Sequence, residues 1–288
     1  MKYLILGCNG MAGHVISQYL VEKGHSVVGF ARQGSNICET LIGDACDKNT
    51  VEKLLQGSKF DIVVNCIGIL NKAVEEKLSI GIYLNSVLPH FIAEKLQHTD
   101  TRLIHISTDC VFNGRKGKYR EDDKPDADSI YGISKSLGEV VDQKNLTIRT
   151  SIIGPELKRN GVGLFHWFMS QNQAVEGYAG VEWSGVTTLQ LAKEIEKMAV
   201  SPITGLYHLV NNDTINKYDL ISLFNIYCRT NKLEIIKNIN ISVDKSLVNT
   251  RVDYKVGIPS YHEMVEEMAM WIRNHRELYE QYNIEGMV

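Results

Sequence analysis

The feature that most constrains the fold of this chain is a glycine-rich turn over residues 7–13, GCNGMAG. A continuous apolar run over 2–7 precedes the turn, which is typical of a strand buried on both faces of a parallel sheet. A helical pattern over 14–24 and a second apolar run over 25–30 follow, so the turn lies inside a strand–helix–strand unit. Glycine lets the backbone turn this tightly and approach a pyrophosphate, to which a helix N-terminus offers free N–H groups and a partial positive charge. The sequence therefore predicts a dinucleotide-binding turn; the alternative is a tight turn without a ligand.

Apolar runs and helical patterns continue to alternate, which favours an α/β fold: a doubly wound parallel sheet (Rossmann) with a smaller C-terminal substrate domain. Further strands are expected at 39–44, 61–68, 103–106, 146–153, 205–210 and 240–243. Further helices are expected at 49–56, 81–96, 164–171, 188–198, 216–230 and 261–279. We expect residues 1–153 to form the dinucleotide-binding domain, with 186–212 returning to it. Residues 154–185 and 213–288 then form mainly the substrate-binding domain.

Composition and charge exclude several classes of protein. The formal net charge of the 288 residues is −3, so nothing suggests a nucleic-acid partner. The six scattered cysteines contain no Cys-x-x-Cys pair, which favours reduced thiols of a cytosolic protein over a disulfide framework or a metal site. No apolar run approaches the length of a membrane span, and the N-terminus is interrupted too early for a signal peptide. We therefore expect a cytoplasmic protein that binds no membrane.

The end of the second strand indicates which nicotinamide cofactor the turn would hold. Sites for NAD usually place an Asp or Glu there to bind the ribose hydroxyls. This chain has no acid at that point and carries Arg32, which suits a 2′-phosphate. The sequence favours NADPH, with NADH possible; the alternative for Arg32 is a solvated loop charge.

A tyrosine and a lysine four residues apart, Tyr131 and Lys135, begin a helical pattern and would share one face of that helix. An ammonium beside a phenol stabilises the phenolate. The hydroxyl of Thr108, at the end of the strand at 103–106, would hold a carbonyl oxygen next to the phenol. This set suits proton transfer to or from a carbonyl or alcohol oxygen. A Tyr-x-x-x-Lys spacing alone is more often structural.

Other strand ends add weaker candidates. Asp44 would contact an adenine ring or cap the next helix, and both interpretations stay open. The strand at 61–68 ends in a bend of small residues, where an open α/β sheet binds its ligand. Asn85 is a polar residue in an apolar helical stretch, and the alternative to a functional role is a satisfied, half-buried amide.

Together, these residues resemble the extended short-chain dehydrogenase/reductase superfamily, and within it the dTDP-4-dehydrorhamnose reductases and related nucleotide-sugar 4-ketoreductases. The resemblance is carried by the glycine turn, STDCVFNG at 107–114, Tyr119-x-Glu121-x-Asp123, YGISKSLGE at 131–139 and IRTS at 148–151. It covers the first 150 residues well and is weaker afterwards.

The resemblance implies roles for individual residues. Tyr131 would be the general acid, Lys135 would hold the ribose and lower the pKa of the tyrosine, and Thr108 would bind the substrate carbonyl. The implied cofactor-binding residues are Gly7, Gly10, Met11, Gly13, Arg32, Asp44, Ala45, Cys66, Ile67, Gly68, Asn85, Tyr131 and Lys135. The implied substrate-binding residues are Thr108, Asp109, Cys110, Val111, Phe112, Trp183 and Arg251. Core packing is the alternative for Trp183, and a solvated charge is the alternative for Arg251.

Two departures from the family bear on the substrate. The reductases usually carry a tyrosine where this chain has Cys110, which leaves the identity of the sugar open. Relatives that dehydrate nucleotide sugars carry Thr-Asp-Glu after this strand. The chain has no glutamate at that position, which argues against a 4,6-dehydratase.

The resemblance implies NADPH-dependent reduction of the 4-keto group of a nucleotide-linked 4-keto-6-deoxy sugar, in deoxysugar and cell-surface polysaccharide biosynthesis. The alternatives are a nucleotide-sugar epimerase of the same superfamily and a non-catalytic, NADP-binding regulatory subunit. A homodimer is possible. The nucleotide, the sugar and the stereochemistry of the product stay open.

Overall fold

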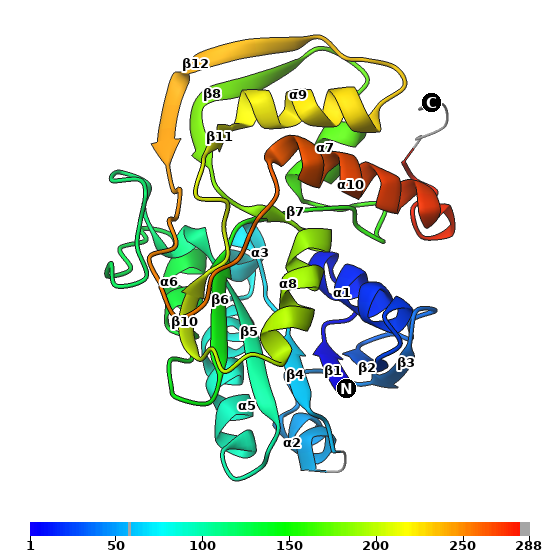
Figure 1. Cartoon of the computed structure of the whole chain (residues 1–288), viewed down its shortest axis with the longest axis vertical. Coiled ribbons are helices and arrows are strands. Elements are labelled where there is room, and N and C mark those ends of the chain that lie inside the picture. Colours follow the sequence, from blue (N-terminus) through cyan, green and yellow to red (C-terminus); the bar gives the residue numbers. More distant parts are fainter. Residues whose placement is uncertain (57–58, 283–288) are drawn as a thin grey trace.

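Seven strands form one parallel sheet in the computed structural model, which describes residues 1–56 and 59–282 (Figure 1). The strands are β1 (Lys2–Leu6), β2 (Ser26–Ala31), β3 (Glu39–Ile42), β4 (Ile62–Asn65), β5 (Arg102–Thr108), β6 (Leu146–Thr150) and β10 (Gly205–His208). Their order is β10-β6-β5-β4-β1-β2-β3, so the direction of winding reverses between β1 and β4. Ligands of doubly wound sheets bind at the carboxyl ends of the strands beside such a reversal. The predicted fold class is confirmed.

Helices cover both faces of this sheet because its strands are apolar on both sides. On one face, α1 (Met11–Glu22) and α8 (Thr188–Ala199) pack against each other and over β1, whose Tyr3 and Ile5 point into that core. On the other face, α2 (Lys48–Gln56) and α5 (Leu88–Leu96) cover a second core, into which Leu4 and Leu6 point. Successive residues of β1 thus serve opposite cores, as the two-residue period of a strand requires.

Elements from the second half of the chain form a second, smaller layer that lies beyond the carboxyl ends of the main strands (Figure 1). A three-stranded sheet has the order β11-β8-β12, and β7 and β9 form a two-stranded parallel pair. The strands are β7 (Ile152–Ile153), β8 (Val175–Trp183), β9 (Val186–Thr187), β11 (Ile215–Asn216) and β12 (Ile235–Asp244). The helices of this layer are α7 (Leu164–Met169), α9 (Lys217–Cys228) and α10 (Tyr261–Asn274), and a 3-10 turn (Arg276–Leu278) follows α10.

Short elements connect β4 to β6. They are α3 (Asn71–Glu76), α4 (Leu78–Ile82), a π-helical turn (Tyr83–Val87), a 3-10 turn (Asp109–Val111) and α6 (Ile130–Ser136). The helix expected at 81–96 is therefore three successive pieces, with one widened turn around Asn85. Asn85 is buried in that turn, and π turns are frequent at functional sites.

Beyond residue 153, a long strand was missed, and a further strand and a helix were predicted with the wrong bounds. β8 was not predicted; its glycines at 177 and 180 interrupt any strand pattern. The strand expected at 240–243 is the end of the longer, mostly polar β12. The helix expected at 261–279 ends at Asn274 because His275 leaves the helical conformation, with φ −122° and ψ 42°. Thr187 caps α8, since its side chain accepts a hydrogen bond from the N–H of Gln190.

The division into two domains stays a prediction. α8 packs on α1 and β10 pairs with β6, so 186–212 lies against the main sheet. One continuous apolar core nevertheless runs from β1 to α9 and α10. The expected substrate domain also includes 283–288, which lie outside the described residues.

Candidate active site

The glycine turn between β1 and α1 fits a pyrophosphate. Gly7 has a φ of +80°, and its carbonyl accepts a hydrogen bond of 2.9 Å from the N–H of Gly10. A Cβ on Gly13 would lie 2.2 Å from that same carbonyl oxygen, so any side chain there would open the turn. Because α1 starts at Met11 and its cap residue is Gly10, no side chain of the cap covers the first free N–H groups. A bound anion would meet backbone donors there.

The end of β4 packs directly on this turn. A Cβ built on Gly7 would lie 3.1 Å from Cγ1 of Ile67 and 3.4 Å from the carbonyl of Cys66. Gly68 follows, close to the Asn85 side chain. The predicted cofactor residues of β1 and β4 are therefore brought together at the reversal of the sheet.

The predicted contacts to the adenosine end lie at the ends of β2 and β3. Arg32 is exposed at the end of β2, and Ala45 is buried beyond β3. Asp44 does not cap α2: its carboxylate accepts a hydrogen bond of 2.9 Å from the N–H of Cys46. Asp47 caps α2 instead, accepting from the N–H of Asn49 at 3.0 Å. The helix-capping alternative for Asp44 is wrong, and its adenine contact stays a prediction.

Asn85 joins three segments of the site. Its amide accepts a hydrogen bond from the N–H of Ile69 and donates one to the carbonyl of Ile69, both of 2.9 Å. It also donates to the hydroxyl of Ser134 at 3.1 Å. A Cβ on Gly138 would lie 1.9 Å from the Asn85 carbonyl, so the segment just after α6 approaches the π turn very closely. Asn85 thereby fixes the loop after β4 and the helix that carries Tyr131.

Tyr131 and Thr108 lie side by side because α6 begins against the strand end of β5. The side chain of Ser129 caps α6, accepting from the N–H of Gly132 at 3.1 Å. A Cβ on Gly132 would lie 2.1 Å from the carbonyl of Cys110, and only a glycine allows this approach. Tyr131 is buried, with 8% of its surface exposed.

The phenol of Tyr131 is held in its neutral form. Burial raises its pKa above the ordinary value, and the Cys110 thiol and the Asp109 carboxylate act in the same direction. Hydrogen bonding with Thr108 opposes them only in part. A protonated phenol is the form that a general acid needs.

Lys135 is buried on α6, with 4% of its surface exposed, and the lowering of the tyrosine's pKa by its ammonium stays a prediction. Its ammonium donates a hydrogen bond of 2.8 Å to the carbonyl of Ile106 and lies 3.4 Å from Nε2 of His105. Burial lowers the pKa of Lys135 to about 8. The Glu139 carboxylate and the Cys66 thiol oppose that change.

His105 is itself oriented from the neighbouring strand. Asn65 is its partner in the pairing of β4 and β5, and the Asn65 amide lies 3.2 Å from Nδ1 of His105. The oxygen of that amide accepts from the N–H of Ile67 at 3.1 Å, so its nitrogen is the group that donates to Nδ1.

Asp109 and Cys110 begin the 3-10 turn that follows β5, and their substrate contacts stay a prediction. Burial raises the pKa of the Asp109 carboxyl, while Lys245 and Lys217 act on it in the opposite direction. Burial also raises the pKa of the Cys110 thiol to about 12. Both lysines come from the C-terminal layer, at the end of β12 and the start of α9, and both are half-buried. The strand end of β5 thus faces positive charge, which suits an anionic substrate.

Three predicted substrate-binding residues serve packing. Val111 and Phe112 are fully buried in a small core, where the ring of Phe112 stacks on Tyr119 at 4.0 Å between centroids. Trp183 is 5% exposed, packs beside Tyr261 and donates its indole N–H to the hydroxyl of Ser151 at 2.8 Å. The core-packing interpretation therefore fits Trp183.

Arg251 is not brought together with Thr108. Its guanidinium donates to the carbonyls of Thr204 and Leu206, at the start of β10, and pairs with Asp253. The candidate site lies at the opposite, carboxyl ends of the parallel strands. The predicted diphosphate contact by Arg251 finds no support in this geometry.

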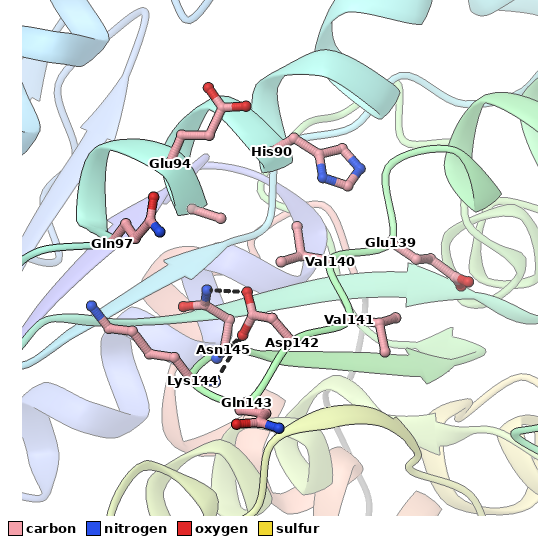
Figure 2. A pocket seen from close by; sticks show the side chains of 11 residues that line it. His90, Glu94, Gln97, Glu139, Val140, Val141, Asp142, Gln143, Lys144 and Asn145 are labelled. Carbon is pink, nitrogen blue, oxygen red and sulfur yellow. Dashed lines mark hydrogen bonds between the residues drawn. The ribbon is translucent and has the colours of Figure 1, made fainter.

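A surface cavity of roughly 630 Å³ lies away from these residues, between α5 and the segment that leads into β6 (Figure 2). Its walls include His90 and Glu94 from α5, Gln97 just after that helix, and Asp142 and Asn145 from the segment before β6. Because Leu146 starts β6, this cavity adjoins the amino end of the strand, where parallel sheets do not bind their ligands.

Within residues 1–56 and 59–282, no cluster of three or more His, Cys, Asp or Glu side chains is arranged to hold a metal ion. No helix in the same part of the chain is long and apolar enough to cross a membrane.

The model of the family described as the RmlD substrate binding domain matches residues 1–242. The chain belongs to this family. It is 26% identical to the spore coat polysaccharide biosynthesis protein SpsK of Bacillus subtilis (strain 168), over 98% of this chain and 96% of that protein. It is also 26% identical to the dTDP-4-dehydrorhamnose reductase of Aggregatibacter actinomycetemcomitans, over 83% of each chain.

Among solved structures, the dTDP-4-dehydrorhamnose reductase (rfbD) from Bacillus anthracis str. Ames in complex with NADP has the same fold. The TM-score is 0.79 at 20% identity, over 94% of this chain and 99% of that chain. These findings confirm the resemblance inferred from the sequence. They agree with the predicted class of activity, an NAD(P)-dependent oxidoreductase of nucleotide sugars.

Sequence reasoning missed His105, which lies beside the Lys135 ammonium, and Asn65, which contacts His105. Asn65 and His105 are polar residues inside apolar strands, a signal that could have identified them. Lys217 and Lys245 gave no such signal, because a lysine in a polar loop or at a helix start is ordinary. Only the fold brings them to the Asp109 carboxyl.

Proposed function

We propose that this protein reduces the 4-keto group of a nucleotide-linked 4-keto-6-deoxy sugar with NADPH. The observation that carries the proposal is the pairing of the Thr108 hydroxyl with a buried, protonated Tyr131 phenol at the end of β5. The glycine turn of the same sheet lies beside the strand end of β4, the neighbour of β5. The Thr108–Tyr131 pair and the glycine turn for the dinucleotide thus lie at the same, carboxyl ends of neighbouring strands.

The residues would divide the reaction as follows. NADPH, when bound, supplies the hydride to the carbonyl carbon. The Thr108 hydroxyl holds the carbonyl oxygen, and Tyr131 transfers its phenolic proton to that oxygen as negative charge develops there. Asn85 and Ser134 keep the helix of Tyr131 in place, and Lys135 binds the ribose while its carbonyl contact to Ile106 fixes its direction.

NADPH rather than NADH is supported by charge at the end of β2. The exposed Arg32 stands where an NAD site would place an acid. The amide of Asn9 donates to the carbonyls of Gln33 and Gly34 at 3.0 and 3.2 Å. These bonds tie the glycine turn to the loop that carries Arg32, so a 2′-phosphate and a pyrophosphate would be bound by connected segments.

The cellular setting and the oligomeric state are part of the same proposal. The name of the spore coat polysaccharide biosynthesis protein supports a role in the synthesis of a surface polysaccharide, and we propose that this role is carried out in the cytoplasm. A homodimer is supported by exposed apolar side chains on α6 and on the elements packed against it: Ile80, Val87, Ile130, Ile133 and Leu137. Light scattering would show a dimer that Ile133→Glu with Leu137→Glu converts to a monomer; a wild-type monomer would contradict this part.

The test is NADPH absorbance with purified protein and a panel of freshly made nucleotide 4-keto-6-deoxy sugars, both dTDP- and UDP-linked, including a 2-acetamido form. Oxidation of NADPH with one member supports the reductase and identifies the nucleotide. Saturable NADPH binding without turnover on any member would favour the regulatory subunit. Interconversion of two nucleotide sugars without net NADPH use would favour the epimerase.

A further inference from the structure

Two cysteines meet beneath the glycine turn. Cys8 lies in the turn and is fully buried, whereas Cys38 precedes β3 and is only partly buried. Between them is Gly29 of β2: a Cβ built there would lie 2.5 Å from Sγ of Cys8 and 3.2 Å from Sγ of Cys38. The two sulfur atoms therefore occupy the space above one glycine, and any side chain at position 29 would displace both.

The surroundings distinguish the two thiols. The neighbouring Cys8 thiol lowers the pKa of Cys38 to about 7, and the hydroxyls of Ser17 and Thr40 act in the same direction. The pKa of Cys8 is raised by Cys38 and by burial. Cys38 is thus the nucleophile of the pair, and Cys8 is the thiol beside it.

The other four cysteines lack this activation. Burial raises the pKa of Cys66, Cys110 and Cys228 to about 12, and burial and Asp44 raise the pKa of the exposed Cys46. Thiolates react with oxidants and thiols do so poorly. Peroxides should therefore oxidise the Cys8–Cys38 pair in preference to the other four cysteines.

We propose that Cys8 and Cys38 form a modification site for peroxides, which convert the pair to a disulfide and thereby weaken dinucleotide binding. The Cys38 thiolate attacks one peroxide oxygen, the O–O bond breaks, and a sulfenic acid and water result after protonation. The Cys8 sulfur then attacks the sulfenic sulfur, the S–O bond breaks, and a second water leaves. Two thiols are oxidised by two electrons, and one hydrogen peroxide is reduced to two waters.

The effect on binding follows from where Cys8 lies. It is part of the turn whose geometry leaves no room at Gly13, so drawing its side chain toward β3 moves the backbone that would bind the pyrophosphate. The disulfide also shifts the segment between Arg32 and Cys38, which the Asn9 amide holds against the turn. The binding effect rests on the proposed cofactor; formation of the disulfide does not.

The experiment exposes reduced protein to hydrogen peroxide, maps the peptides under non-reducing conditions and measures the Kd of NADPH before oxidation, after it and after dithiothreitol. Wild type and Cys46→Ser should give a Cys8–Cys38 linked peptide and an about tenfold weaker Kd that dithiothreitol restores. Cys38→Ser should give neither the linked peptide nor a change of Kd on oxidation.

Free Cys8 and Cys38 after oxidation of other thiols would overturn the proposal, as would a linked peptide with an unchanged Kd. Cys8→Ser, which alters the turn itself, is a second variant only for the peptide map. A reduced protein that binds no NADPH would contradict the proposed function instead, and the peptide map would still decide whether the pair reacts.

Discussion

Two regions of the molecule meet at the end of β5, and they use polar groups in opposite ways. On the side of the main sheet, Asn65, His105 and Lys135 are buried and fixed by neighbouring strands. On the C-terminal side, Lys217 and Lys245 are half-buried and act on the site from the ends of their elements. The difference teaches that polar groups of the main sheet are held by the pairing of neighbouring strands, whereas the C-terminal layer brings positive charge near the Asp109 carboxyl from the ends of its elements. Mutations of the buried groups of the main sheet should have large effects on stability or activity that do not depend on salt. Mutations of the half-buried lysines of the C-terminal layer should have small effects that salt screens.

The largest effect on stability is expected at Lys135. Its pKa is lowered in the folded protein from 10.5 to about 8, so below pH 8 the buried ammonium disfavours folding at full strength. As the pH rises from 8 to 10.5, the folded protein loses that proton first, and the disadvantage disappears. The unfolding free energy of wild type relative to Lys135→Met should therefore rise by up to about 3 kcal/mol across this range. Denaturant titrations at several pH values measure it; a difference independent of pH would show that Lys135 is not desolvated.

The second prediction concerns the glycine turn. Gly13→Ala places a Cβ 2.2 Å from the Gly7 carbonyl, so the turn must open. We expect NADPH to bind about 100-fold more weakly, as measured by calorimetry. Gly34→Ala is the matched control, because a Cβ there meets nothing within 4 Å. Equal losses in both variants would contradict the role given to the turn.

Arg32→Ala should have an intermediate effect. Removing the guanidinium should weaken NADPH binding about tenfold and leave NADH binding nearly unchanged, because only NADPH carries the 2′-phosphate. The ratio of the two Kd values is the measurement. Equal changes for both cofactors would assign Arg32 to the solvated surface.

The smallest effects distinguish Lys245 from Arg251. Lys245→Ala should raise KM a few-fold, less so at high salt, with kcat almost unchanged, because a half-buried charge is screened. Arg251→Ala should leave KM unchanged but lower stability by about 1 kcal/mol, since it loses backbone contacts at the start of β10. A raised KM for Arg251→Ala with an unchanged KM for Lys245→Ala would place the substrate phosphates at Arg251. That result would contradict the roles given to the two regions.

A contrast between local patterns and tertiary packing explains which features could be predicted from the sequence and which could not. The strands of the parallel sheet, the glycine turn and the Tyr131–Lys135 spacing were predictable because each is a local pattern. The placement of Thr108 beside Tyr131 was expected from the strand end and the family resemblance, since the two residues meet only through the packing of α6 on β5. β8 was missed because its pairing with β12 joins residues about 60 positions apart, and its glycines remove the local pattern. Trp183 and Arg251 suited a substrate by type, but their contacts with Ser151 and Thr204 arise only from tertiary packing.

The central claim is that Tyr131 donates the proton at the end of β5. The most direct test is the rate of NADPH oxidation by wild type and Tyr131→Phe with the nucleotide keto sugar that wild type reduces, together with the Kd of NADPH for both. We predict a kcat lower by about 10²–10⁴-fold in the variant with a nearly unchanged Kd, because only the proton donor is removed. A variant with full kcat would contradict the assignment.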